Sequence, residues 1–167
     1  LLKGEAAEEE AYETSVECDI DAYIPASYIK NEYQKLDIYK RISGIENEEE
    51  YMDMQDELID RFGDIPKSVD NLLRIAKLRA LGHEAYVTEI TINRQEVRLT
   101  MYQKAQIKVN EIPQLISVYR GDLKLVPGET PVFHYIDQRN RNADSLAMIE
   151  KAEELLKGIL ELKSDEA

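Results

Sequence analysis

The chain has 167 residues and a formal net charge of −13, with 21 Lys and Arg against 34 Asp and Glu. This length suits about one domain, and the single cysteine excludes a disulfide within the chain. The sequence has no run of about 18 apolar residues, the length that a membrane-spanning helix needs. Because nucleic-acid backbones are bound by Lys and Arg, the acidic charge argues against direct nucleic-acid binding and favours basic protein surfaces as partners.

The first residues predict a linker rather than part of a fold. Residues 1–13 carry several Glu and no periodic apolar pattern, which is typical of a flexible connection. We therefore expect a folded domain over 14–167. The acidic start is unlike a secretory signal peptide, so we expect a cytoplasmic protein.

A strand is expected at the start of the domain. Apolar and polar residues alternate over 16–24, which predicts a strand with one buried face. Cys18 lies on that face between two acidic residues, and both burial and acidic neighbours raise the pKa of a thiol. We interpret Cys18 as a packed structural residue rather than a nucleophile.

Three helices are expected next, over 26–42, 47–62 and 66–81. Asn47 suits the N-cap of the second helix, and Gly63 suits its end. In the first helix, Ile29, Tyr33 and Leu36 share a stripe that we expect to face the core. Gly82 is expected to end the third helix.

The second half of the chain predicts a small sheet. We expect strands over 85–92 and 96–102, joined by a tight turn, and a further short strand over 105–109. A short helix over 112–120, strands over 123–126 and 132–136, and a final helix over 143–163 are expected to follow. Helices and strands are therefore segregated along the chain rather than alternating. This pattern favours an α+β fold, in which helices pack with a small, mostly antiparallel sheet.

The sequence carries none of the common catalytic or ligand-binding motifs. It has no glycine-rich phosphate loop, and His83 and His134 lack the neighbouring ligands that zinc sites use. No pair of carboxylates has a spacing that marks an acid and a base. We therefore expect no catalytic residue, no cofactor and no metal ion in this chain.

The most acidic stretch covers residues 46–65, with nine acidic residues against one Arg. At 100° per residue the second helix places Met52 and Ile59 on its apolar side. The opposite side, which we expect to face solvent, carries Glu49, Asp53, Asp56, Glu57 and Asp60.

One interpretation of this stretch is purely structural. The residues from Asp60 to Gly63 then form an ordinary helix end. Arg61 would pair with Glu57 four residues earlier, and Phe62 would pack against the core. A row of charged residues on a helix is most often a solvated face.

Three segments, taken in order, resemble one protein family. They are AYIPASYIKNEYQKLDIYKR at 22–41, ELIDRFGDIP at 57–66 and NLLRIAKLRALG at 71–82. They resemble the C-terminal domain of the bacterial transcription-repair coupling factors (Mfd) over about 14–163, with ELIDRFG as the most specific piece. The resemblance implies that residues 1–13 connect this domain to a preceding motor region.

The resemblance implies a regulatory role without catalysis. In that family the whole protein is an ATP-driven translocase on double-stranded DNA, which removes stalled RNA polymerase and recruits the repair subunit UvrA. ATP and magnesium belong to its motor region, outside this chain. The C-terminal domain would mask the UvrA-recruiting surface of an N-terminal UvrB-like module until RNA polymerase and DNA are engaged.

The same resemblance nominates the site residues. The ELIDRFG segment carries over Glu57 and Asp60 as acidic partners of basic residues on the masked module. Arg61 either joins that contact or braces Glu57, while Asp53 and Asp56 share the helix side without support from a family motif. The residues expected to be structural are Phe62, Gly63 and Pro66.

Two other functions stay open from the sequence. Ten tyrosines, three of them near one helical stripe, would suit a freestanding domain that binds a small molecule or performs unrecognised carboxylate chemistry. Those three are Tyr28, Tyr33 and Tyr39. Direct contact with nucleic acid would use the basic residues of the middle part, Arg94, Arg98, Lys104 and Lys108. We favour the regulatory domain, because helix-spaced aromatic residues more often form core and acidic residues surround the basic part.

Overall fold

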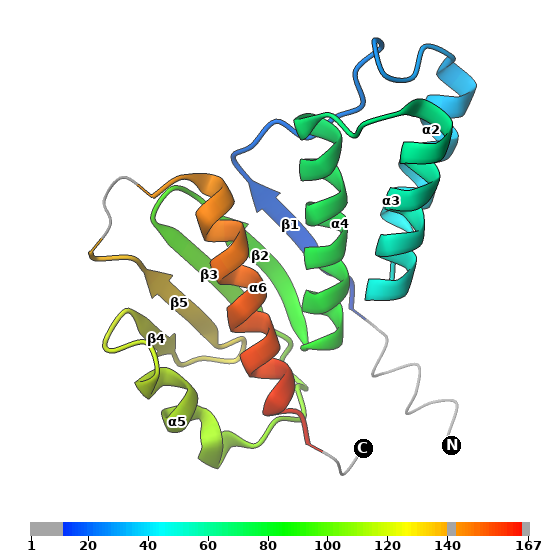
Figure 1. Cartoon of the computed structure of the whole chain (residues 1–167). Helices are drawn as coiled ribbons and strands as arrows, with labels where there is room; N and C mark the ends of the chain where they lie inside the picture. The colour runs from blue at the N-terminus through cyan, green and yellow to red at the C-terminus, as the bar shows by residue number, and fades with distance from the viewer. Residues whose placement is uncertain (1–11, 140–142, 165–167) are drawn as a thin grey trace, which may run out of the picture. The chain divides into compact units, whose positions relative to one another are not determined.

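The computed structural model describes residues 12–139 and 143–164 (Figure 1). Most of the predicted linker, residues 1–11, lies outside the described residues, so the expected linker and domain boundaries stay predictions. The chain forms two compact units: a helical unit over Ile20–Leu81, and a sheet unit made of the residues before and after it. No helix among the described residues is long and apolar enough to span a membrane.

The helical unit contains the helices α2 Glu32–Ser43, α3 Glu48–Phe62 and most of α4 Lys67–Glu84. Asparagine caps set two of the helix starts. The Asn31 side chain accepts hydrogen bonds from backbone N–H groups in the first turn of α2, and the Asn47 side chain caps α3 as predicted. Gly63 ends α3, also as predicted, with its N–H group donating to the carbonyl of Ile59 at 3.0 Å.

The core of the helical unit is built from apolar side chains of all three helices. Ile38 and Ile42 of α2, Leu58 of α3 and Leu73 of α4 are buried. Burying one such side chain contributes about 1.5–3 kcal/mol to the free energy of unfolding. The Tyr39 hydroxyl accepts a hydrogen bond from the Ile24 N–H at 2.7 Å, which holds the segment before α2 on the same core.

The prediction for α2 was wrong in its start and in its buried stripe. Residues 26–28 form a turn, and the helix begins only at Glu32, because the Asn31 side chain provides the cap there. Tyr33 is 86% exposed and Leu36 is 58% exposed, so neither faces the core. At 100° per residue both lie roughly opposite the buried Ile38, which defines the inward side of this helix.

The sheet unit contains a five-stranded sheet in the order β1-β2-β3-β5-β4. Its strands are β1 Ser15–Cys18, β2 Val87–Ile92, β3 Glu96–Met101, β4 Leu123–Val126 and β5 Val132–Ile136. β1 pairs with β2 in parallel, and every other pair is antiparallel. The helix α6 Ser145–Glu161 packs on β2 and β3 (Figure 1), while the 3-10 helix η1 Val109–Glu111 leads into α5 Ile112–Ser117. The α+β prediction with a mostly antiparallel sheet is confirmed.

Two strand predictions were wrong. The strand expected over 16–24 stops at Cys18, because Cys18 pairs with Ile92 and β2 ends there, before its hairpin turn. Residues beyond this point have no strand to pair with. The strand expected over 105–109 is reduced to one isolated bridge, between Ile107 and Lys163.

Gly82 does not end the third helix, which continues to Glu84. The glycine is instead a point of close approach. A Cβ atom placed on Gly82 would lie 2.7 Å from Cδ1 of Ile90 and 3.1 Å from Cγ2 of Thr14. Gly82, Ile90 and Thr14 all belong to the sheet unit, and the absence of a side chain at Gly82 allows the last residues of α4 to lie directly against the other two.

Candidate functional site

The solvent-facing side of α3 carries three aspartates that we call the Asp face: Asp53, Asp56 and Asp60. α3 buries Met54 and Leu58, and its periodicity of 3.6 residues turns the Asp face away from that side. All three Asp residues are exposed. Within the described part of the chain, none of the three forms an ion pair. The Asp face is therefore a row of uncompensated negative charge.

Glu57 lies on the same helix but in a different electrostatic setting. Its carboxylate accepts hydrogen bonds from both terminal nitrogens of the Arg41 guanidinium on α2, with 2.5 Å between Arg41 Nη2 and Glu57 Oε1. Arg61 Nη1 donates to Glu57 Oε2 at 2.9 Å. The hydrogen bond from Arg41, assisted by that from Arg61, lowers the pKa of Glu57 to about 2. The charge of Glu57 is thus already balanced within the helical unit.

The residues after Glu57 form a helix end held by several contacts. The Arg61 guanidinium lies 4.9 Å from the centroid of the Phe62 ring, which in turn packs at 5.7 Å from the ring of Tyr28. The Tyr28 hydroxyl donates to the carbonyl of Gly63 at 2.9 Å. Gly63 has φ 89° and ψ −163°, a conformation that is essentially restricted to glycine.

Pro66 lies immediately before the first residue of α4. Its carbonyl accepts hydrogen bonds from the N–H groups of Val69 at 3.1 Å and Asp70 at 2.9 Å. The predicted pairing of Arg61 with Glu57 and the packing of Phe62 are therefore present. A role of these residues in contacts with another module stays a prediction.

Two features of this site were missed from the sequence. Met52 is 54% exposed and Ile59 is 49% exposed, although both were expected on the apolar side of α3. The buried stripe of α3 is narrower than its apolar residues suggest, since it centres on Met54 and Leu58. The second feature is Arg41, whose contact with Glu57 joins two helices and so leaves no spacing signal in the sequence.

The comparisons with known proteins bear on this same region. The family model described as the TRCF domain matches residues 18–112, which include the whole helical unit and therefore all of α3. The chain belongs to the TRCF domain family. This confirms the resemblance that was read from the segments at 22–41, 57–66 and 71–82.

Individual relatives extend the match over the rest of this TRCF domain. This chain is 32% identical over 163 residues to the transcription-repair-coupling factor of Bacillus subtilis (strain 168). The aligned region covers 96% of this chain and 14% of that protein. The chain is 39% identical over 103 residues to the transcription-repair-coupling factor of Staphylococcus haemolyticus (strain JCSC1435), covering 62% of this chain and 9% of that protein. The TRCF domain therefore spans only a small part of these curated relatives.

A solved structure shows the same fold. The crystal structure of the C-terminal domain of a transcription-repair coupling factor matches the TRCF domain with a TM-score of 0.79 and 24% sequence identity. The match covers 93% of this chain and 97% of the other. It thus includes β4, β5 and α6, which lie beyond the region of the family model.

The cysteine and the two histidines of the TRCF domain lie in surroundings typical of residues that stabilise a fold. Burial, assisted by the charge of Asp19, raises the pKa of Cys18 to about 11, so its thiol stays protonated near neutral pH. The His83 ring stacks on Tyr12 with 4.6 Å between ring centroids, and His134 Nε2 lies 3.6 Å from Glu96 Oε2. Among the described residues, no group of three or more His, Cys, Asp or Glu side chains could hold a metal ion.

The basic residues considered for nucleic-acid binding are partly matched by acidic neighbours. Arg98 Nε lies 3.8 Å from Glu96 Oε2, and Lys108 Nζ lies 3.5 Å from Glu111 Oε2. These neighbours reduce the positive potential that a phosphate backbone would need. The structure gives no separate support to this function.

The tyrosines considered for ligand binding have different surroundings. Tyr28 and Tyr39 use their hydroxyl groups on backbone atoms, and Tyr33 is exposed. A hollow of about 400 Å³ lies instead in the sheet unit, with the rings of Tyr119 and Tyr135 in its wall. Its other lining residues are Val118, Arg120, Asp122, Asp137, Arg139 and Lys151.

The groups in this hollow are largely engaged with one another. Lys151 Nζ lies 5.8 Å from the ring centroid of Tyr119 and 5.6 Å from that of Tyr135, and it pairs with Glu154 at 3.0 Å. Burial, assisted by the charge of Glu154, raises the pKa of Tyr119 to about 12, so this phenol is neutral near neutral pH. A neutral phenol is a poor general base, so Tyr119 is not prepared for that role at that pH.

Proposed function

We propose that this TRCF domain is the non-enzymatic, autoinhibitory domain of a transcription-repair coupling factor. It covers the UvrA-recruiting surface of an N-terminal UvrB-like module in the same protein until RNA polymerase and double-stranded DNA are engaged. Translocation and the use of ATP and magnesium belong to other parts of that bacterial, cytoplasmic protein. The observation that carries the proposal is the Asp face: three exposed carboxylates on one helix side with no partner in the described residues.

A covering domain needs a contact that forms within one protein and can be released. Interfaces between domains of one chain are usually modest in area and polar, which keeps them reversible. A row of like charges at Asp53, Asp56 and Asp60 gains most when it meets basic residues, and such contacts determine which surfaces associate. Coupling of this kind typically amounts to about 1–3 kcal/mol, so engagement of another part of the protein suffices to open it.

The structure changes how we divide the roles of the nominated residues. Asp60 has an exposed carboxylate that is available to a partner, and Asp53 and Asp56 lie on the same side. Glu57 is already bound by Arg41 and Arg61, so we assign it mainly to joining α2 and α3. Arg61 then contributes by holding Glu57 and by packing on Phe62, next to the Asp face.

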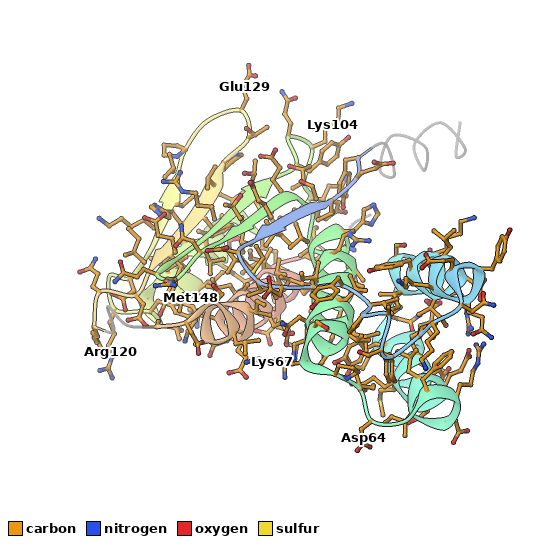
Figure 2. The ribbon with its side chains drawn as sticks, turned by 90° about the horizontal axis from the view of Figure 1, so that it is seen from above. Asp64, Lys67, Lys104, Arg120, Glu129 and Met148 are labelled. Carbon is orange, nitrogen blue, oxygen red and sulfur yellow. The ribbon has the colours of Figure 1, made fainter. Side chains whose placement is uncertain are left out.

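The test is charge reversal in the full-length coupling factor that carries this domain. Asp53→Lys combined with Asp60→Lys is expected to raise the affinity for UvrA by about 5- to 150-fold, because the covering contact is lost. Glu129→Lys is the control of matched charge type, since Glu129 is exposed on the loop between β4 and β5 (Figure 2). An unchanged UvrA affinity in the charge-reversed protein would overturn the proposal.

A further inference from the structure

Two large apolar side chains stand in solvent beside the Asp face. Met52 is 54% exposed and Ile59 is 49% exposed, on a helix whose other apolar residues are mostly buried or half-buried. They are seven residues apart, so they lie two turns apart on one line along α3. Asp56 lies between them, four residues after Met52 and three before Ile59. The apolar pair and the acidic residues are therefore immediate neighbours.

The two flanks of the Asp face differ in kind. At 100° per residue, Glu57 and Arg61 lie on one flank, where Arg41 of α2 closes it with hydrogen bonds. Met52 and Ile59 lie on the other flank, where about half of each side chain is left uncovered by the described residues. α3 thus presents to solvent a charged stripe that is bordered on one side by apolar side chains.

We infer that Met52 and Ile59 form one recognition surface with the Asp face, and that its partner is a protein surface in which Lys or Arg residues border an exposed apolar patch. This inference rests on the proposed function and specifies it. The partner is the N-terminal module of the same coupling factor, and the surface covered there is amphipathic rather than simply basic. The three unpaired carboxylates favour an occupant that carries Lys or Arg residues, and the exposed apolar pair beside them favours one that also presents apolar side chains.

The two parts of the surface have different physical consequences. Contacts between exposed charges weaken as salt rises, since the screening length falls from about 10 Å at 0.1 M to about 3 Å at 1 M. Burial of apolar side chains does not depend on ionic strength in this way. We therefore expect the covering contact to keep a salt-resistant part that depends on Met52 and Ile59.

The test uses full-length coupling factor with Met52→Gln and Ile59→Gln combined. Gln keeps a similar length at exposed positions, so the fold is expected to persist, which circular dichroism checks. The control is Tyr33→Gln combined with Leu36→Gln, which removes two exposed apolar side chains from α2 instead. Affinity for UvrA is measured at about 0.1 M and 1 M salt, relative to the Asp53→Lys, Asp60→Lys protein, which represents the uncovered state.

The expected result is an affinity for UvrA about tenfold above that of the unaltered protein. The loss of two partly buried apolar contacts weakens the covering contact by about this factor. At the higher salt the Met52→Gln, Ile59→Gln protein is expected to match the uncovered state, whereas the α2 control stays covered in part. If Asp-face reversal raises UvrA affinity but the Met52→Gln, Ile59→Gln protein behaves like the α2 control, this inference is wrong and the proposed function stands. If Asp-face reversal itself has no effect, the proposed function fails and this inference fails with it.

Discussion

Arg41 of α2 and Glu57 of α3 are joined by two hydrogen bonds between one guanidinium and one carboxylate, across sixteen residues of sequence. Arg61 adds a third hydrogen bond to the same carboxylate at 2.9 Å. This arrangement connects the two helices near the end of α3. It also separates Glu57 from the neighbouring Asp face, since one carboxylate is compensated and the others are not.

The first prediction concerns the contribution of this pair to stability. Glu57→Gln and Arg41→Ala are each expected to lower the free energy of unfolding by about 1 kcal/mol. Two hydrogen bonds between charged groups stabilise a fold only modestly more than a simple exposed ion pair does. The measurement is urea unfolding followed by circular dichroism. Asp60→Asn is the control and should change the free energy by less than about 0.5 kcal/mol. Equal losses in all three variants would contradict the assigned roles.

The second prediction concerns pH. The pKa of Glu57 is about 2 in the folded chain, below its ordinary value of 4.5, so folding favours the charged form. The pair therefore stabilises the fold above about pH 4.5, and this stabilisation is lost as pH falls towards about 2. Glu57→Gln should flatten the dependence of the urea midpoint on pH in this window, and Arg41→Ala should do the same. A full acid dependence retained by Glu57→Gln would show that the pair does not carry this effect.

The third prediction concerns Gly63. Its backbone at φ 89° and ψ −163° is essentially inaccessible to other residues, and apart from Gly63 and its two chain neighbours no residue has an atom within 4 Å of where a Cβ would be placed. Gly63→Ala should therefore cost about 1–3 kcal/mol through backbone strain alone. Gly44→Ala is the matched control, since Gly44 has φ −88° and only ordinary contacts. Thermal unfolding compares the two, and similar melting temperatures would contradict the assignment.

The fourth prediction concerns Gly82. Gly82→Ala should cost about 1–3 kcal/mol, because the new methyl group would approach Cδ1 of Ile90 to 2.7 Å. Ile90→Val removes that atom, so the double variant should lose less stability than the sum of the two single variants. Additive losses from the two changes, measured by urea unfolding, would show that this contact is not the cause.

Elements with local signals were predicted well from the sequence. The Asn47 cap and the Gly63 end of α3 depend on residues next to the helix, and the strands around the 93–95 turn depend on short alternating patterns. The pairing of Arg61 with Glu57 also follows from spacing within one helix. Each of these features is determined by contacts over a few residues.

The failures involve contacts between distant segments. The strand predicted over 16–24 ends at Cys18 because its partner β2 ends, which alternation within the segment cannot reveal. Tyr33 and Leu36 form a plausible stripe until the cap at Asn31 and the burial of Ile38 define the inward side of α2. The Arg41 contact and the exposure of Met52 and Ile59 likewise depend on how α3 packs. The candidate surface was therefore located from the sequence, but its charge distribution was not.

The proposed contact between α3 and the N-terminal module can be tested directly by placing a photo-crosslinking amino acid at position 60 of the resting full-length coupling factor. We predict crosslinks from position 60 to the UvrB-like module that decline at about 1 M salt, and none from a crosslinker placed at position 129. If position 60 yields no crosslink to that module, or no more than position 129 does, α3 does not cover it and the autoinhibitory account is wrong.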